Sequence, residues 1–94
     1  MEEAFQDVII KRFKSYIESN DLSGADLFLD GLLCFDAPED LPWDYVYQKV
    51  YLHACLKKRQ NFVDWLRPMF EKLDTIDRIA LRQMFAYGNY LLNK

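Results

Sequence analysis

Apolar side chains recur at helical spacing along almost the whole chain, and this periodicity is the feature that most limits the possible folds. Residues that recur every three or four positions fall on one face of an α-helix. The chain has only 3 glycines and 3 prolines, and no Asn-Gly or Asp-Gly turn separates two alternating runs, so the sequence does not favour β-hairpins. The pattern therefore predicts an all-α protein, and 94 residues are few enough for a single domain over residues 1–94.

The first three helices follow from where the apolar pattern starts and stops. We expect the first over about residues 2–19, and the second from a cap at Ser23 up to a turn that contains proline. Pro42 suits the first turn of a third helix, which Asp40 caps and which runs to about Lys58. Apolar residues occupy most of the circumference of this third helix, so it is predicted to lie in the middle of the fold.

Two further helices complete the pattern. Asn61 is the expected cap of the fourth helix, and Pro68 inside it should kink the helix or delay its start. Asp74 or Thr75 is the expected cap of the fifth, which runs nearly to the C-terminus. Gly88 within this last helix either permits the close approach of a neighbouring helix or weakens the end of the helix. The prediction is thus about five helices, each antiparallel to the next.

The charge balance bears on the class of partner. The 15 acidic residues outnumber the 12 basic ones, which leaves a net charge of −3. A domain that binds duplex nucleic acid normally has a basic surface, so nucleic acid is not an expected partner. Two basic clusters, at Lys11–Lys14 and Lys57–Arg59, are interpreted as solvated helix ends.

Several features favour a cytoplasmic protein. No uncharged stretch is long enough to span a membrane. The acidic N-terminus, Met1-Glu2-Glu3, lacks the positive charge of a signal peptide. The 2 cysteines do not form a disulfide framework. We therefore expect a soluble protein in the cytoplasm.

The residues needed for catalysis or metal binding do not come together in the sequence. His53 is the only histidine, and Cys55 lies two positions later, on a different face of the same helix. Cys34, His53 and Cys55 are one ligand short of a structural zinc site and lack its close pairs. The glycines form no phosphate-binding loop. We therefore expect no enzymatic activity and no cofactor or metal.

Two stretches of the chain are similar to each other at an offset of about 38–40 residues, a period typical of helical-hairpin repeats. They cover residues 16–36 and 54–74. In each stretch a helix ends in a short polar turn, an apolar residue (Leu22 or Phe62) opens the next helix, and an apolar run ends in aspartate. This pattern predicts two helical hairpins followed by one helix without a partner.

The first stretch resembles the tetratricopeptide repeat. The residues that follow the order of the family pattern are Tyr16, Asn20-Asp21, Leu22, Ala25 and Asp36-Ala37-Pro38. The second stretch departs from the pattern, because Trp65 replaces the small residue and the turn is one residue longer. The terminal helix, with Ala86-Tyr87, resembles the first helix of a third repeat. The resemblance implies degenerate tetratricopeptide-like hairpins with a terminal helix.

Within that fold, the short acidic chain is similar to the chaperones of type III secretion needle subunits. The resemblance covers residues 22–73 and the lone terminal helix. It implies a chaperone that holds an amphipathic helix, the C-terminal helix of the needle protein. It also implies a second small helical co-chaperone, and therefore a hetero-oligomer.

The same resemblance suggests where the partner binds, because in tetratricopeptide hairpins the first helix of each pair lines the groove. The residues expected to line it here are Ile10, Lys14, Ile17, Lys49, His53, Leu56, Leu81 and Phe85. An apolar floor with two lysines and a histidine would suit an amphipathic helix with acidic residues at its edges. Leu56→Asp or Phe85→Asp is then expected to abolish partner binding without loss of helix. The alternative, that Ile10, Leu81 and Phe85 belong to the core, stays open.

A second interpretation starts from the acidic stretch that precedes and opens the third helix. Small acidic helical inhibitors present Asp, Glu and Tyr side chains to the basic active site of a nuclease toxin, where charge complementarity speeds association. The residues that would do so here are Asp36, Glu39, Asp40, Asp44, Tyr45 and Tyr47. An immunity or inhibitor protein of this kind is the alternative function.

Overall fold

The computed structural model describes residues 5–34, 42–73 and 77–94, and these residues form five α-helices and no β-strand. The helices are α1 (Phe5–Glu18), α2 (Leu22–Cys34), α3 (Trp43–Leu56), α4 (Gln60–Glu71) and α5 (Arg78–Asn93). The all-α prediction is confirmed, with the number and order of the helices as expected.

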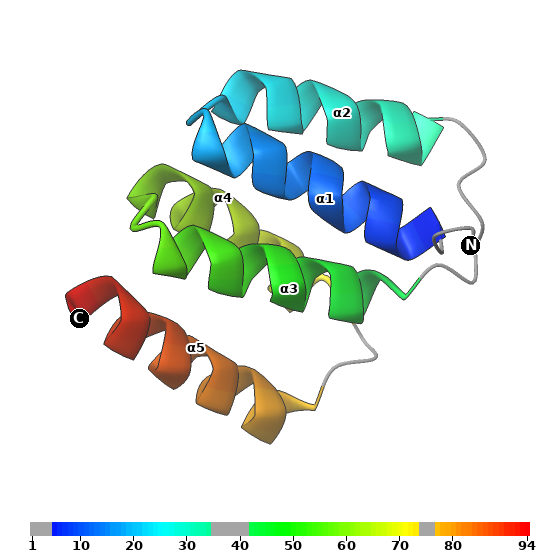
Figure 1. Ribbon diagram of the computed structural model, residues 1–94. Coiled ribbons are helices and arrows are strands. Elements are labelled where there is room, and N and C mark those ends of the chain that lie inside the picture. The colour runs from blue at the N-terminus through cyan, green and yellow to red at the C-terminus, as the bar shows by residue number, and fades with distance from the viewer. Residues whose placement is uncertain (1–4, 35–41, 74–76) are drawn as a thin grey trace.

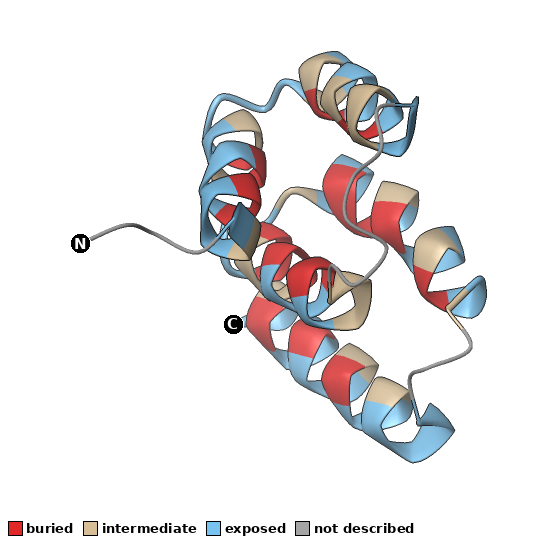
Figure 2. Ribbon diagram, turned by 90° about the vertical axis from the view of Figure 1, so that its right-hand side faces the viewer, coloured by how far each residue is buried: buried red, intermediate tan, exposed pale blue. Residues whose placement is uncertain are grey.

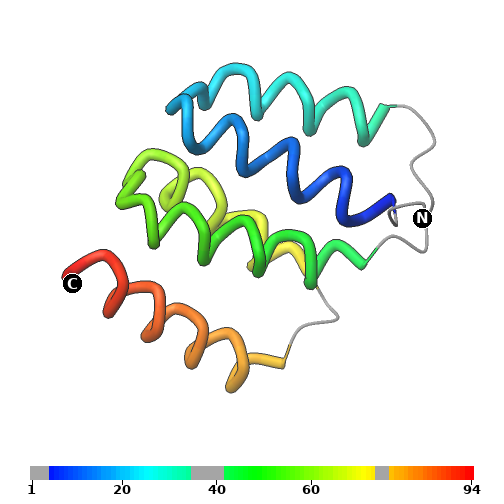
Figure 3. Tube along the Cα trace, in the orientation of Figure 1, coloured from blue at the N-terminus to red at the C-terminus, as the bar shows by residue number. Residues whose placement is uncertain are grey.

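The odd-numbered helices form one layer. α1, α3 and α5 lie side by side and run in the same direction, with α3 in the middle (Figure 1). α2 and α4 run the opposite way, so each helix is antiparallel to the next one along the chain (Figure 3). α4 packs against α3, whereas α2 packs mainly against α1. The prediction that the third helix is central is therefore confirmed.

α3 forms the centre of the core because other helices cover it on three sides. Its buried residues are Val46, Tyr47, Val50, Tyr51, Ala54 and Cys55. In Figure 2 the buried positions lie on the faces where neighbouring helices meet. Burying one large apolar side chain stabilises a fold by roughly 1.5–3 kcal/mol relative to leaving it exposed. The apolar character of α3 around most of its circumference thus explains its place in the fold.

Aromatic rings join three helices around Tyr51. The centroid of the Tyr51 ring lies 5.6 Å from that of Phe70 in α4 and 5.4 Å from that of Phe85 in α5. The rings of Phe70 and Phe85 are 5.8 Å apart, with their planes at 87°. Edge-to-face pairs of this kind contribute about 0.5–1.5 kcal/mol beyond the area that they bury. The three rings therefore hold α4 and α5 against α3.

The turns that follow α1 and α3 have the same structure. Asn20 and Lys58, which lie 38 residues apart, have positive φ angles of 55° and 58°. The amide of the following residue bonds the carbonyl five positions before it, at 2.8 Å after α1 and 2.9 Å after α3. This Schellman motif satisfies carbonyls that the end of a helix leaves without partners. The two hairpins thus repeat at the spacing expected from the sequence.

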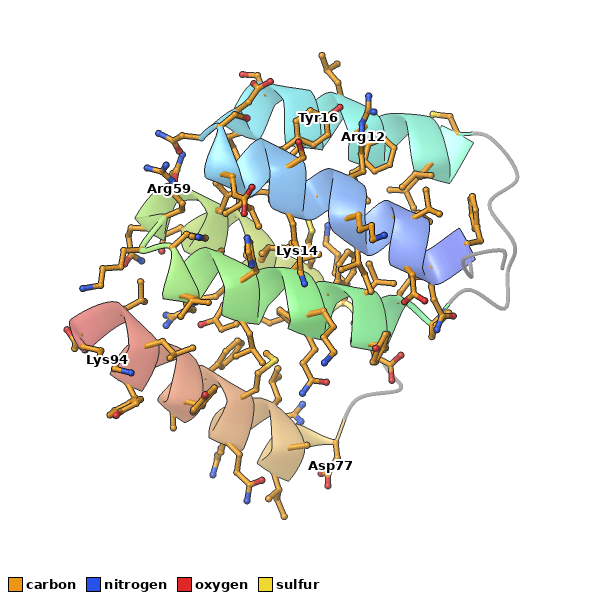
Figure 4. The ribbon with its side chains drawn as sticks, in the orientation of Figure 1. Arg12, Lys14, Tyr16, Arg59, Asp77 and Lys94 are labelled. Atoms are coloured by element: carbon orange, nitrogen blue, oxygen red, sulfur yellow. The ribbon has the colours of Figure 1, made fainter. Side chains whose placement is uncertain are left out.

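Side chains from one of these turns bind the other. Nε of Arg59 donates to the carbonyl of Ile17 at 3.1 Å, and its Nη2 donates to the carbonyl of Glu18 at 3.3 Å (Figure 4). Nδ2 of Asn61 donates to Oδ1 of Asn20 at 3.0 Å. These bonds fasten the start of the second hairpin to the end of α1.

Two of the predicted helix caps are wrong. Asp21 caps α2 instead of Ser23, because its Oδ1 accepts a hydrogen bond from the N–H of Gly24 at 3.0 Å. Ser23 lies inside the first turn of that helix. α4 begins one residue before Asn61 and has no side-chain cap. Pro68 does not delay the start of α4, and the helix continues through it.

α5 has a cap that the sequence pattern did not single out. Oδ1 of Asp77 accepts a hydrogen bond from the N–H of Ile79 at 3.1 Å. The expected caps Asp74 and Thr75 precede this residue and lie outside the described residues, as does Asp40 before α3. An aspartate at this position favours the helix both as a hydrogen-bond acceptor and as a negative charge at the helix N-terminus.

Gly88 brings α5 close to α3, which is one of the two roles expected for it. A Cβ atom at this position would lie 2.7 Å from Cε1 of Tyr51 and 2.9 Å from Sγ of Cys55, both shorter than van der Waals contact. A Cβ atom at Gly31 in α2 would have no neighbour within 4 Å. The two glycines therefore differ in whether a side chain fits.

This difference gives a matched pair of variants. Gly31→Ala should raise the free energy of unfolding by about 0.5–1 kcal/mol, because alanine favours the helix and meets nothing. Gly88→Ala should lower the free energy of unfolding by about 1–2 kcal/mol, because the clash of the added methyl group with α3 outweighs the gain in helix propensity. Urea denaturation measures both values. Equal stabilisation by the two variants would mean that α5 does not pack on α3 as described.

Candidate functional site

The side of α3 opposite its buried residues carries apolar and charged groups at the surface. The outer face is defined here by Lys14 and Glu18 of α1 and by Tyr45, Lys49, His53 and Leu56 of α3. The α3 residues recur every three or four positions, so they form one stripe along the helix. Figure 4 shows Lys14 on the side of α1 that borders α3. The outer face therefore spans two neighbouring helices of the layer.

Apolar surface and positive charge alternate along the outer face. Tyr45 near the start of α3 is 40% exposed, and Leu56 at its end is 57% exposed. Between them, Nζ of Lys49 lies 5.5 Å from the centroid of the Tyr45 ring, a cation–π contact. The stripe thus offers two apolar contact points with a cation between them.

His53 lies where α3 and α1 meet. Its Nε2 is 3.6 Å from Oε1 of Glu18, and this buried nitrogen has no hydrogen-bond partner among the described residues. Burial lowers the pKa of His53 below its usual value, and the positive charges of Lys14 and Lys57 lower it further. Glu18 acts in the opposite direction but does not compensate fully. The neutral imidazole is therefore favoured in the folded protein.

The structure brings together half of the residues expected to line a groove. Those on the outer face are Lys14, Lys49, His53 and Leu56. Ile10 is 6% exposed and Ile17 is 0% exposed, so both side chains lie in the core. Helical spacing groups these two residues with Lys14, but their side chains belong to the core and are not accessible to a partner.

Leu81 and Phe85 lie on the side of α5 that faces α4. The Phe85 ring packs against Tyr51 and Phe70, and the guanidinium of Arg67 in α4 lies 5.4 Å from its centroid. Leu81 lines a cavity together with residues of α4. The structure therefore does not place these two residues on the outer face. Phe85→Asp is now expected to destabilise the fold, because it would bury a carboxylate among aromatic rings.

Several surface residues near this region were missed by sequence reasoning. Tyr87 and Tyr90 of α5 are 53% and 60% exposed, and their rings stack with centroids 6.3 Å apart. Tyr87 follows Phe85 by two residues, so helical spacing puts it on the opposite side of α5 from α4. Tyr45 was expected only on the alternative inhibitor surface, and extending the stripe one turn before Lys49 would also have placed it on the outer face.

The described residues contain no group of three or more His, Cys, Asp and Glu side chains placed to hold a metal ion. Cys34 is exposed and Cys55 is buried, and neither forms a disulfide. Burial raises the pKa of the Cys55 thiol. Helical spacing puts this thiol on the far side of α3 from His53, so the two do not form a nucleophile and base pair.

Of the residues in the acidic stretch, Asp44, Tyr45 and Tyr47 lie within the described part of the chain. Tyr47 is 8% exposed and packs against Phe70, and burial raises its pKa. The acidic residues that lie outside the described residues are Asp36, Glu39 and Asp40. Asp44 is partly buried at the start of α3. Tyr47 is therefore not available to an inhibitor surface of the kind considered above.

Comparisons of the chain with protein-family models, with characterised proteins and with solved structures find no match. None of the helices within the described ranges is both long enough and apolar enough to cross a membrane.

The titration of His53 tests the electrostatics of this face. Because folding lowers its pKa, the unfolded chain binds the proton more tightly, and stability should fall as the pH drops from 6.5 towards the folded pKa. NMR should give a midpoint below 6.5 for the imidazole. Lys14→Gln should raise this midpoint, and Glu18→Gln should lower it. A midpoint above 6.5, or no response to Lys14→Gln, would contradict the arrangement described.

Proposed function

We propose that the protein binds another polypeptide through the outer face and acts as a small chaperone for a helical segment of its partner. The observation that carries the proposal is the α3 stripe, in which exposed Tyr45 and Leu56 flank the cation of Lys49. Exposed large apolar side chains beside fixed charge are typical of protein-binding surfaces.

The residues of the stripe indicate what kind of partner would fit it. Tyr45 and Leu56 are eleven positions apart, which is about three helical turns. A partner helix that lies along α3 could therefore contact both residues with apolar side chains that recur along one of its faces. Lys49 and Lys14 would meet carboxylates at the edges of that helix. The ligand is therefore an amphipathic helix with acidic flanks.

Two features of the architecture support a tetratricopeptide-like arrangement. The hairpin turns repeat 38 residues apart with the same positive-φ residue and hydrogen bonds. α5 runs parallel to α1 and α3 and lies in the same layer (Figure 1). In that repeat family the first helices of successive hairpins line the binding groove, which corresponds to the α1, α3 and α5 layer.

The resemblance to needle-subunit chaperones extends the proposal. The ligand would then be the C-terminal helix of a type III secretion needle protein. The complex would include a second small helical co-chaperone, and it would form in the cytoplasm. Such a chaperone should gain stability when its partner binds, since a ligand that binds only the folded state stabilises it.

Three single variants test the outer face. Leu56→Asp and Lys49→Glu should each weaken binding of the natural partner by about tenfold or more, because one loses an apolar anchor and the other repels the acidic edge. Leu27→Asp is the matched control, since Leu27 on α2 is 72% exposed and lies outside the outer face. The partner is recovered with tagged protein from the native cell, identified by mass spectrometry and titrated against each purified variant.

The pattern across the variants decides the outcome. All three should keep the helicity of the wild type in circular dichroism, because none of the positions is buried. If Leu27→Asp weakens binding as much as Leu56→Asp does, the outer face is not the site. If the affinity falls steeply with salt concentration and is unchanged by Leu56→Asp, the contact is dominated by charge, as expected for an inhibitor.

A further inference from the structure

A cavity of about 610 Å³ lies between the end of α4 and the first half of α5. Its apolar lining consists of Phe70, Leu73, Leu81 and Phe85. Phe70 is almost fully buried, whereas Phe85 and the two leucines keep part of their surface accessible. The cavity thus has an apolar floor wide enough for one or two side chains of a ligand.

The rim of this cavity is basic. Arg78 and Arg82, one helical turn apart, line it and are exposed. Neither forms an ion pair or hydrogen bond with another described residue. Arg67 lies over the Phe85 ring, and Glu71 is the only carboxylate among the described residues of the lining. Among the described residues of the lining, positive charge therefore exceeds negative charge.

The arginines also stand at the unfavourable end of their helix. The first turn of α5 contains Arg78 and no acidic residue, and the Asp77 carboxylate is engaged as the cap through the N–H of Ile79. A helix N-terminus carries partial positive charge, which disfavours a nearby cation and attracts an anion. A bound carboxylate would relieve this repulsion and would interact with the guanidinium groups at the same time.

We propose that this cavity binds an acidic segment of a partner polypeptide, with an apolar side chain on Phe85 and Leu81 and carboxylates on Arg78 and Arg82. The floor favours a peptide over a nucleic acid, because the aliphatic and aromatic side chains of a peptide fit its apolar lining. The cavity lies on the α4 side of α5, away from the outer face. The proposal therefore does not depend on the proposed chaperone function.

NMR titration of the wild-type protein with the acetylated peptide Glu-Glu-Leu-Phe-Glu-Glu tests this site. The peptide is too short to form a helix alone, so it is a poor ligand for the outer face. We expect amide shifts at Arg78, Leu81 and Arg82. The same peptide with Gln in place of Glu should bind about tenfold more weakly or worse. Arg78→Glu with Arg82→Glu should weaken binding of the acidic peptide by about a hundredfold.

Lys49→Glu is the matched control, because it reverses an exposed cation on the outer face, and it should leave the titration unchanged. The double variant should keep its helices, since both arginines are exposed and neither forms a hydrogen bond or ion pair with another described residue. Equal binding of the Gln peptide, shifts confined to α1 and α3, or absence of binding would overturn the proposal. So would inorganic phosphate shifting these amides while the acidic peptide does not, because the site would then bind a small anion only.

Discussion

The packing of α3 against three other helices is the constraint on which the rest of the structure depends. α1, α4 and α5 each contact this helix, whereas α2 reaches the assembly mainly through α1. Tyr51 shows how the contact is made, because its ring meets Phe70 and Phe85 and leaves room for Gly88 to approach. A chain of 94 residues buries a smaller share of its surface than a larger domain does. A helix that packs against three others therefore contributes much of the stability.

The same arrangement leaves one side of α3 accessible. With three sides of α3 covered, the side with Tyr45, Lys49 and Leu56 is the one left for another molecule. The parallel layer of α1, α3 and α5 presents that side beside Lys14, and the repeated turns at Asn20 and Lys58 set the hairpins at one spacing. The position of the outer face is thus a consequence of how the core is built.

Much of the fold could be predicted from the sequence. The helical period defined the helices, the apolar circumference of α3 indicated its central place, and Gly88 was correctly expected to allow a close contact. The caps were predicted less well, because the polar residues near a helix start are interchangeable by type. Asp21 and Ser23 are both good caps, and only the turn geometry decides between them.

The candidate site was only partly predictable for a related reason. Periodicity shows which residues share a face of a helix, but it does not show which neighbour that face meets. Ile10 and Ile17 were grouped correctly with Lys14, yet the first two lie in the core and the third at its edge. Leu81 and Phe85 face α4, because the packing of the Phe85 ring on Tyr51 and Phe70 sets the rotation of α5.

Native-state hydrogen exchange followed by NMR tests the central role of α3 most directly. Amides that exchange only through global unfolding report the most stable part of a fold, whereas less well packed elements open locally. The account predicts the slowest exchange for amides between Val50 and Cys55, and faster exchange by local opening throughout α2. Exchange in α2 as slow as in α3, or local opening of α3 while α1 stays protected, would contradict it.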